Sequence, residues 1–322
     1  MLKKPLAWPF WCVSANPAID KRMRVSTLIP ERVNRVNEVR AAPGGKAAHV
    51  AMVLRTLGAD PLWIGFAGGL TGTQLLDGLL ALGIRVQPVT ANGDTRINLE
   101  IIDDHGGVTE LLEPGLPIGK NEWKSLFEAC NKIFSQPANP GIVIASGSLP
   151  VGADPGFYAK LTTLVHQHGH KIFLDTSGEP LRLALGAAPD FIKPNREEAE
   201  WLIGETIANP QSWKSAANRL IQLGARSAIV SLGEDGFVWQ AGAGQDTYHA
   251  KSSSVTVTSS VGCGDATVAA FAYAMPAGFS VEKTLRLAAA CGAANCLADS
   301  PGLLREADIE AFEPLVRIEK LA

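Results

Sequence analysis

The sequence predicts an α/β fold in which a mostly parallel sheet is buried between helices. Apolar runs of strand length recur along the 322 residues, and longer stretches with helical periodicity separate them. Strands that alternate with helices are typical of βαβ units, whose parallel sheets are covered on both faces. The predicted strands are residues 10–14, 62–66, 141–146, 171–175, 191–193 and 227–232.

The first predicted strand lies in a segment that also resembles a signal peptide. Lys3 and Lys4 precede an apolar stretch at 6–13, but this stretch is short and broken by proline. We therefore interpret 10–14 as a buried strand. Elsewhere the chain has no run of about 18 apolar residues, the length that a membrane-spanning helix needs.

The first predicted helix follows the glycines at 44 and 45. Its apolar residues recur at helical spacing and form one face: Ala47, Val50, Ala51, Leu54 and Leu57. Ligands of such sheets bind outside the carboxyl ends of the strands, where the glycine-rich loops of this chain fall.

Two regions, 20–40 and 95–112, break this pattern. Ile97 and Leu99 alternate with Asn98 and Glu100, as expected for half-exposed strands. The two regions could pair into a small sheet that covers a site. We predict one domain over 1–322, with these regions as a discontinuous β lid.

Composition excludes several classes of protein. Apolar residues make up 46% and charged residues 19%, which is typical of globular proteins. A net charge of −3 gives no electrostatic case for nucleic acid or an anionic membrane as partner. The five cysteines are odd in number and without C-x-x-C spacing, which favours reduced thiols in the cytoplasm.

The stretch 255–271 carries the strongest chemical signal. A β-branched run leads to Gly262, Cys263 and Gly264, and then to Asp265 at the start of an alanine-rich helix. Backbone N–H groups at a helix N-terminus stabilise negative charge, and the carboxylate beside them can act as a base. This pattern suits phosphoryl transfer. An ordinary strand-to-helix turn is the alternative.

Other nucleotide motifs fit less well. A dinucleotide fingerprint needs a third small residue where Thr267 stands. Neither Gly45-Lys46 nor Gly119-Lys120 has the flanking residues of a P-loop. If the chain uses ATP, it does so without a Walker motif.

Seven motifs in order, spread over nearly the whole chain, resemble the ribokinase-like (PfkB) carbohydrate kinases. The similarity is greatest to the branch with 1-phosphofructokinase and tagatose-6-phosphate kinase. The motifs are 16–20 (NPAID), 44–46 (GGK), 95–98 (TRIN), 146–150 (SGSLP), 193–195 (KPN), 231–233 (SLG) with Gly236, and 261–265 (VGCGD). The resemblance implies a ribokinase-like three-layer α/β/α fold with a small β lid.

The resemblance implies that Asp265 deprotonates the sugar hydroxyl. Gly262, Cys263 and Gly264 would then hold the charge of the transferring phosphoryl group. A positioned carboxylate contributes about 10² to 10⁴ in rate to such a step. Asp265 could also serve as a helix N-cap, and the two roles are compatible.

On the sugar side, the resemblance implies that Asp20 binds sugar hydroxyls, although a turn carboxylate is the alternative. Gly44 and Gly45 would let the backbone approach the sugar, and Ser148 belongs to a motif of the same pocket. Lys46 faces either substrate phosphate or solvent.

Two arginines mark the branch that uses phosphosugars. The guanidinium of Arg96 can bind phosphate bidentately from the lid. Arg35 lies where such kinases carry a second basic lid residue, which in relatives reaches across a dimer. Either arginine could instead be merely solvated.

The nucleotide side is implied by the later motifs. Lys193 and Asn195 end a strand, and Glu198 would help to hold magnesium through water. Asn195 and Glu198 also form an ordinary capping box. Ser231, Gly233 and Gly236 resemble the turn under ATP, and Asn295, on a helix predicted at 281–297, could reach the adenine end.

One loop departs from the branch. The usual G-G-K-G-x-N reads here Gly44-Gly45-Lys46-Ala47-Ala48-His49, so a histidine replaces a sugar-binding asparagine. We predict that His49 contacts the sugar and alters substrate preference. A histidine packed on the helix face near the core is the alternative.

Two further features each have a functional and a purely structural interpretation. Cys263, in the anion hole, is either a reactive thiol of lowered pKa or a small spacer. His166, His168 and His170 suggest a metal, but we favour cations at a helix C-terminus.

The sequence as a whole predicts a cytoplasmic kinase that uses ATP and Mg²⁺. Its expected substrate is a phosphorylated ketohexose, fructose 1-phosphate or tagatose 6-phosphate, and its expected assembly is a homodimer through the lid. The alternatives are a kinase for an unphosphorylated sugar or nucleoside, and a degenerate protein that binds sugar phosphates without turnover.

Overall fold

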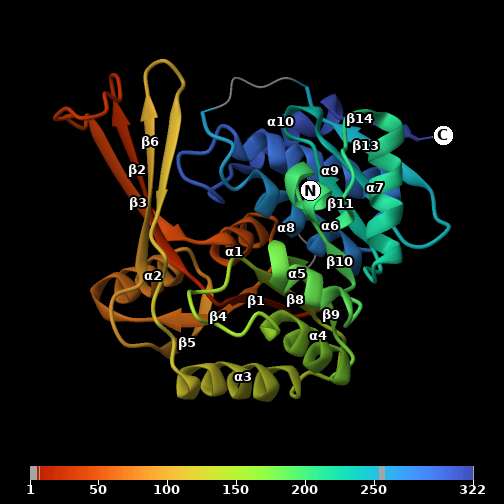
Figure 1. Cartoon of the computed structure of the whole chain (residues 1–322), viewed down its shortest axis with the longest axis horizontal. Coiled ribbons are helices and arrows are strands. Elements are labelled where there is room, and N and C mark those ends of the chain that lie inside the picture. Colours follow the sequence, from red (N-terminus) through yellow and green to blue (C-terminus); the bar gives the residue numbers. More distant parts are fainter. Residues whose placement is uncertain (1–5, 7, 254–257, 322) are drawn as a thin grey trace.

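A ten-stranded sheet forms the centre of the molecule (Figure 1). The computed structural model describes residues 6, 8–253 and 258–321, so the β-branched run at 255–257 and Lys3 and Lys4 lie outside the described residues. The strands in spatial order are β14 (Arg317–Lys320), β13 (Thr247–Lys251), β12 (Phe237–Gln240), β11 (Ala228–Ser231), β10 (Phe191–Ile192), β9 (Lys171–Asp175), β8 (Ile142–Ser146), β1 (Phe10–Ser14), β4 (Pro61–Ala67) and β5 (Arg85–Thr90).

The seven strands from β11 to β5 are parallel, and β12, β13 and β14 extend the sheet antiparallel. The parallel strands therefore end at one edge, where the polar segments that follow β1, β8, β9, β10 and β11 meet. All six predicted strands are present, each within two residues of its predicted ends.

Both faces of this sheet are buried. On β1, Phe10 and Cys12 belong to one hydrophobic cluster and Trp11 and Val13 to the other, because successive side chains of a strand point to opposite faces. This explains why β1 reads as a continuous apolar run.

Five helices supply each covering layer. The first cluster includes residues of α1 (Lys46–Thr56), α2 (Gly69–Ala81), α8 (Cys263–Ala277), α9 (Val281–Asn295) and α10 (Glu306–Phe312). The second includes residues of α3 (Lys120–Phe134), α4 (Phe157–Gln167), α5 (Gly178–Leu185), α6 (Arg196–Ile203) and α7 (Pro210–Gln222). Short 3₁₀ turns are η1 (Gly233–Asp235) and η2 (Glu313–Leu315). The three-layer α/β/α prediction is confirmed.

A second sheet projects from the main body (Figure 1). Its strand order is β3 (Glu38–Gly44), β2 (Ala18–Val25), β6 (Arg96–Asp103) and β7 (Val108–Leu112). β2 and β6 pair in parallel, with Asp20 opposite Asn98. Residues far apart in sequence thus become neighbours.

A buried ion pair anchors this second sheet. The Arg22 Nε atom lies 2.6 Å from the Glu100 Oε2 atom, and Arg22 also donates to the carbonyl oxygens of Ala298 and Asp299 at 2.8 Å. Arg22 therefore ties the second sheet to the loop after α9.

The second sheet also exposes apolar side chains. Val39, Val108, Leu111 and Leu112 are between 41 and 60% exposed. Within the described part of the chain, no helix is both long and apolar enough to cross a membrane.

Candidate active site

A cavity of about 970 Å³ lies where the second sheet meets the carboxyl edge of the main sheet. Its lining includes Asp20, Gly45, Lys46, His49, Arg96, Ser148, Lys193, Asn195, Glu198, Ser231, Gly233, Gly236, Gly262, Cys263, Gly264 and Asp265. Fourteen of these sixteen residues belong to the seven motifs, and Glu198 and His49 each lie three residues beyond one. The cavity thus gathers most of the residues that the sequence singles out.

The N-terminus of α8 enters this cavity. Gly262 caps the helix with a φ of 86°, a left-handed conformation that favours glycine, and a Cβ atom there would lie 2.8 Å from Pro301. The Cys263 amide donates to the Ser260 carbonyl oxygen at 3.2 Å. The Cys263 amide is therefore already used and does not contribute to the predicted anion hole. The amides of Gly264 and Asp265 are those left at the helix start.

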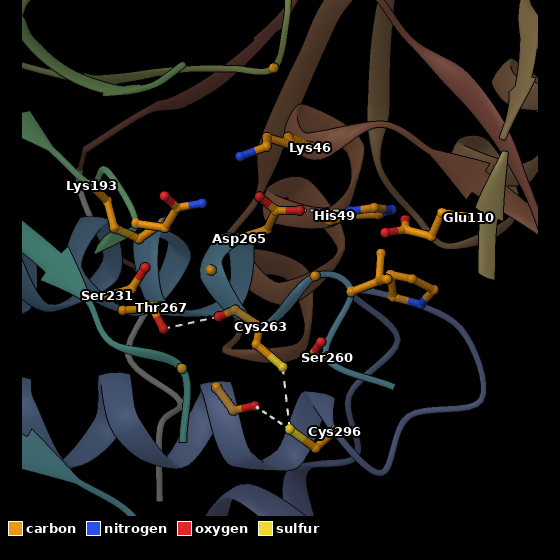
Figure 2. Close-up of a pocket in the computed structure, with 18 of the residues that line it drawn as sticks. Lys46, His49, Glu110, Lys193, Ser231, Ser260, Cys263, Asp265, Thr267 and Cys296 are labelled. Atoms are coloured by element: carbon orange, nitrogen blue, oxygen red, sulfur yellow. Dashed lines mark hydrogen bonds and ion pairs between the residues drawn. The ribbon is translucent and has the colours of Figure 1, made fainter. Parts of the chain in front are cut away.

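Asp265 is 4% exposed and stands beside these amides. Its Oδ2 atom lies 2.7 Å from the Nδ1 atom of His49. Figure 2 shows the two side chains facing each other. The predicted base is thus next to the predicted anion hole, but its carboxylate is already paired with a side chain from α1.

His49 bridges two carboxylates. Its Nε2 atom lies 2.6 Å from the Oδ2 atom of Asp20, on the opposite side of the ring from Asp265. Burial alone would lower the pKa of His49, but the charge of Asp20 and the hydrogen bonds with Asp20 and Asp265 raise it to about 10. His49 is buried, as expected for a histidine packed near the core. It also lines the cavity, as expected for a residue of the sugar pocket.

The Asp20 carboxylate is held by His49 and Asn98. Burial would raise its pKa, but the charge and hydrogen bond of His49 and the hydrogen bond from Asn98 Nδ2, at 2.9 Å, keep the pKa lowered. Gly44 does not line the cavity. It packs on Asp20 instead, so closely that a Cβ atom at Gly44 would overlap an oxygen of that carboxylate.

Lys46 and Lys193 both point to Asp175, a residue that the motifs do not reveal. The Lys46 Nζ atom lies 3.1 Å from one Asp175 oxygen, and the Lys193 Nζ atom lies 3.4 Å from the other. Burial would raise the pKa of Asp175, but these two ammonium groups lower it. Its place at the end of β9, on the carboxyl edge, is the signal that could have identified it.

The two predicted phosphate ligands differ in position. Arg96 lines the cavity, but it donates to the carbonyl oxygens of Pro17, Glu113 and Asn16 at 3.3, 2.9 and 3.1 Å. Arg35 is exposed in the loop between β2 and β3 and does not line the cavity of its own chain.

The nucleotide side is built from turns. Asn195 and Glu198 form a capping box at the start of α6, in which the Asn195 side chain accepts from the Glu198 amide at 2.8 Å. Ser231, Gly233 and Gly236 line the cavity around η1. Ser148 also lines it and accepts a hydrogen bond from Asn16 Nδ2 at 3.2 Å.

Asn295 departs from its predicted place at the adenine end. It is 2% exposed and lies beneath the cavity, where its Nδ2 atom donates to the Val261 carbonyl oxygen at 2.7 Å. Its Oδ1 atom accepts from the Gly302 amide at 2.9 Å. Asn295 therefore supports the loop before α8, and both ends of its amide are satisfied.

Cys263 also differs from the reactive thiol considered above. Its Sγ atom lies 3.3 Å from that of Cys296 (Figure 2). That hydrogen bond and burial raise the pKa of Cys263, while the same contact lowers the pKa of Cys296. Cys263 is therefore paired with a second thiol of the cavity wall, Cys296.

The histidines at the end of α4 have separate partners. His166 Nε2 lies 2.8 Å from Asp190, and His170 Nδ1 accepts from the Gly141 amide at 3.0 Å. Among the described residues, no group of three or more His, Cys, Asp or Glu side chains could hold a metal ion.

Comparison with known proteins agrees with this geometry. Residues 14–306 match the pfkB family of carbohydrate kinases. The chain belongs to this family. It is 33% identical to 1-phosphofructokinase of Rhodobacter capsulatus over 279 residues, 86% of this chain and 87% of that protein. With 1-phosphofructokinase of Escherichia coli K12 it shares 31% over 309 residues, 95 and 97% of the two chains.

A solved structure supports the same fold. Phosphofructokinase-2 of Escherichia coli in complex with substrates and products superposes with a TM-score of 0.88 at 27% identity, over 96% of this chain and 99% of that one. The chain is therefore a pfkB carbohydrate kinase, an enzyme that transfers a phosphoryl group to an alcohol, and this family uses ATP with a metal ion.

Proposed function

We propose that this kinase phosphorylates a hydroxyl of a phosphorylated ketohexose, fructose 1-phosphate or tagatose 6-phosphate. The products are a sugar bisphosphate and ADP. One observation carries the proposal: Asp265, beside the first amides of α8, opens onto the same cavity as Asp20 of the second sheet. The 1-phosphofructokinases among its relatives support the phosphorylated substrate.

Asp265 would accept the proton of the sugar hydroxyl as the oxygen attacks the terminal phosphorus. The amides of Gly264 and Asp265 would bind the charge that develops on the phosphoryl oxygens. Asp20 and Asn98, from adjacent strands, would orient the sugar, together with His49, Ser148 and the backbone of Gly45. Lys46 and Lys193 line the same cavity and would contribute positive charge beside the phosphates.

Magnesium fits the nucleotide side. Mg²⁺ prefers oxygen ligands and is usually held by one or two carboxylates, phosphates and waters. Glu198 lines the cavity, and its Oε2 atom accepts a hydrogen bond from the Asn195 amide. The other carboxylate oxygen takes no part in that bond and could bind the ion. Glu198 would hold the ion, and the ion would neutralise phosphate charge.

The second sheet would act as a lid and as a dimer interface. Its exposed apolar residues, Val39, Val108, Leu111 and Leu112, are suited to pairing with a second copy. In such a homodimer, Arg35 would reach the partner's cavity, since it does not line its own.

Closure of the second sheet over the substrates would exclude water and limit ATP hydrolysis. We place the enzyme in the cytoplasm, consistent with five free cysteines.

A coupled ADP-release screen tests the proposal. Fructose 1-phosphate, fructose 6-phosphate, tagatose 6-phosphate and the free sugars are offered with ATP and Mg²⁺, and Asp265→Asn serves as the blank. We expect turnover with a ketohexose phosphate and little with the free sugars. Absence of turnover with every phosphosugar would overturn the proposal.

A kinase for an unphosphorylated sugar is the second candidate. It is favoured by Arg96, which already donates to three backbone carbonyls and so has only two of its five N–H groups left for phosphate. Arg96→Ala discriminates between the two functions. If the substrate carries a phosphate, KM for it should rise at least tenfold, and if it does not, KM should barely change.

A further inference from the structure

His49 lies between the two carboxylates that face the acceptor sugar. Each of its ring nitrogens is within 2.7 Å of a carboxylate oxygen, one on Asp265 of α8 and the other on Asp20 of β2. An ionised carboxylate only accepts hydrogen bonds, whereas a neutral imidazole has one N–H donor. Both contacts are therefore satisfied together when the ring is an imidazolium.

The surroundings favour that cation. The other charged groups near it are Lys46 of α1, which acts on Asp265, Arg96 of β6, which acts on Asp20, and Glu110 of β7. These groups include two cations, but the ring nitrogens of His49 bond to the two carboxylates. Figure 2 shows His49 between Asp265 and Glu110.

We propose that His49 is a positioning residue that, as an imidazolium, cross-links Asp20 to Asp265. The His49 side chain then orients both Asp20, which would bind the sugar, and Asp265, which would act as the base. This inference rests on the proposed function. An asparagine at this position would carry no charge, so the two buried carboxylates would face each other without a cation between them.

The charge state of His49 can be read without turnover. Imidazole ¹⁵N NMR of the wild-type protein, with His49→Asn to assign the signal, should show both nitrogens protonated at pH 8. Asp20→Asn should bring the titration of that signal closer to pH 6.5, the ordinary value for histidine. A wild-type His49 that is neutral at pH 8, or whose titration is unchanged in Asp20→Asn, would overturn the cross-link.

Kinetics test the positioning role. His49→Asn and His49→Gln should each lower kcat at least tenfold, with a smaller change in KM for the sugar phosphate. Unchanged kcat in both variants would overturn that role. If the wild type turns over no sugar phosphate, the proposed function fails while the NMR result still decides the charge state.

A second feature, independent of His49, is the thiol pair in the cavity wall. Cys263 begins α8 and Cys296 follows α9, and both line the cavity. Their sulfur atoms are 3.3 Å apart, against about 2 Å in a disulfide, so a shift of roughly 1 Å would join them. The other cysteines, Cys12, Cys130 and Cys291, are buried.

We infer that Cys263 and Cys296 form a site for reversible oxidation by a small-molecule disulfide such as oxidised glutathione. The Cys296 thiolate attacks one sulfur of the oxidant and releases one thiol. The Cys263 thiolate then attacks the mixed disulfide, closes the Cys263–Cys296 bond and releases the second thiol. Two cysteines lose two protons and two electrons, and the oxidant becomes two thiols.

Closing this bond would pull on the loop that forms the anion hole, because Cys263 stands between Gly262 and Gly264. Oxidation should therefore inhibit the kinase. Asn295 donates to both the Val261 carbonyl oxygen and, at 3.5 Å, the Cys263 sulfur, so its contacts would shift as well.

The test treats the protein with oxidised glutathione. We expect the mass to fall by two hydrogens, a peptide that links Cys263 to Cys296, and a loss of activity of at least tenfold that dithiothreitol reverses. Cys296→Ser should lack the cross-link and the response, and Cys291→Ala, which alters a buried thiol of the same helix, should keep both. No cross-link in the wild type, or a cross-link without loss of activity, would overturn the inference.

Discussion

The two halves of the cavity are built in different ways. The half proposed to bind the transferring phosphate, called here the phosphoryl half, consists of main-chain amides at the start of α8, fixed by a capping glycine with a positive φ. The half proposed to bind the sugar, called here the sugar half, consists of side chains from β2, α1 and β6 that bond to one another, with His49 at their centre. A half made of backbone depends on glycine and on helix geometry, whereas a half made of side chains changes with a single substitution.

The largest expected effect concerns the attachment of the sugar half. Arg22→Met removes one partner of the buried pair with Glu100 and also the bonds to the carbonyls of Ala298 and Asp299. Leaving a buried charge unpaired costs about 3 to 5 kcal/mol of unfolding free energy. Urea unfolding would measure this loss, and a loss below about 1 kcal/mol would show that the tether is dispensable.

Next in size is a change in the phosphoryl half. Gly262→Ala forces a Cβ atom into a left-handed residue against Pro301 and should displace the amides of Gly264 and Asp265. Loss of a single anion-hole donor costs about 10² to 10³ in kcat. Steady-state kinetics should show this fall with KM for the sugar little changed. A rise confined to KM would assign Gly262 to substrate binding instead.

A smaller effect is expected at Asp20, the carboxylate proposed to bind the sugar. Asp20→Asn keeps the shape of the side chain but removes the charge with which Asp20 would accept hydrogen bonds from the sugar hydroxyls, each worth about 1.5 to 3 kcal/mol. KM for the sugar phosphate should rise by roughly ten- to a hundredfold, and KM for ATP should change much less. Equal changes in both constants would break the separation of the two halves.

The most gradual effect is a dependence of stability on pH, spread over several pH units. Because the folded pKa of His49, about 10, is above its ordinary value of 6.5, its contribution is complete below pH 6.5 and is lost as pH rises to about 10. The slope is on the order of 1 kcal/mol per pH unit. The difference in unfolding free energy between the wild type and His49→Asn should therefore shrink over this range. A constant difference would contradict the cationic ring.

The sequence predicted the backbone half better than the side-chain half. The run of Gly262, Gly264 and Asp265 encodes a local helix start, so its geometry follows from neighbouring residues. Asp175 was missed because its two partners, Lys46 and Lys193, come from α1 and from beyond β10, and only the assembled sheet brings them together.

The same reasoning explains the other differences. Arg96 stays a predicted phosphate ligand and lines the cavity, but sequence spacing does not show that the carbonyls of Asn16 and Pro17 also lie within reach of its guanidinium. Asn295 was placed at the adenine end because the helix α9 was predicted correctly, but its direction depends on the loops that pack beside it.

The central claim is that Asp265 and the amides beside it drive phosphoryl transfer to a sugar phosphate bound in the same cavity. The most direct measurement compares ADP release by the wild type and Asp265→Asn, with calorimetry of fructose 1-phosphate binding to both. We predict that the variant loses at least 10² in kcat, as expected for a general base, and still binds the sugar. A variant that retains turnover within tenfold of the wild type would contradict the claim.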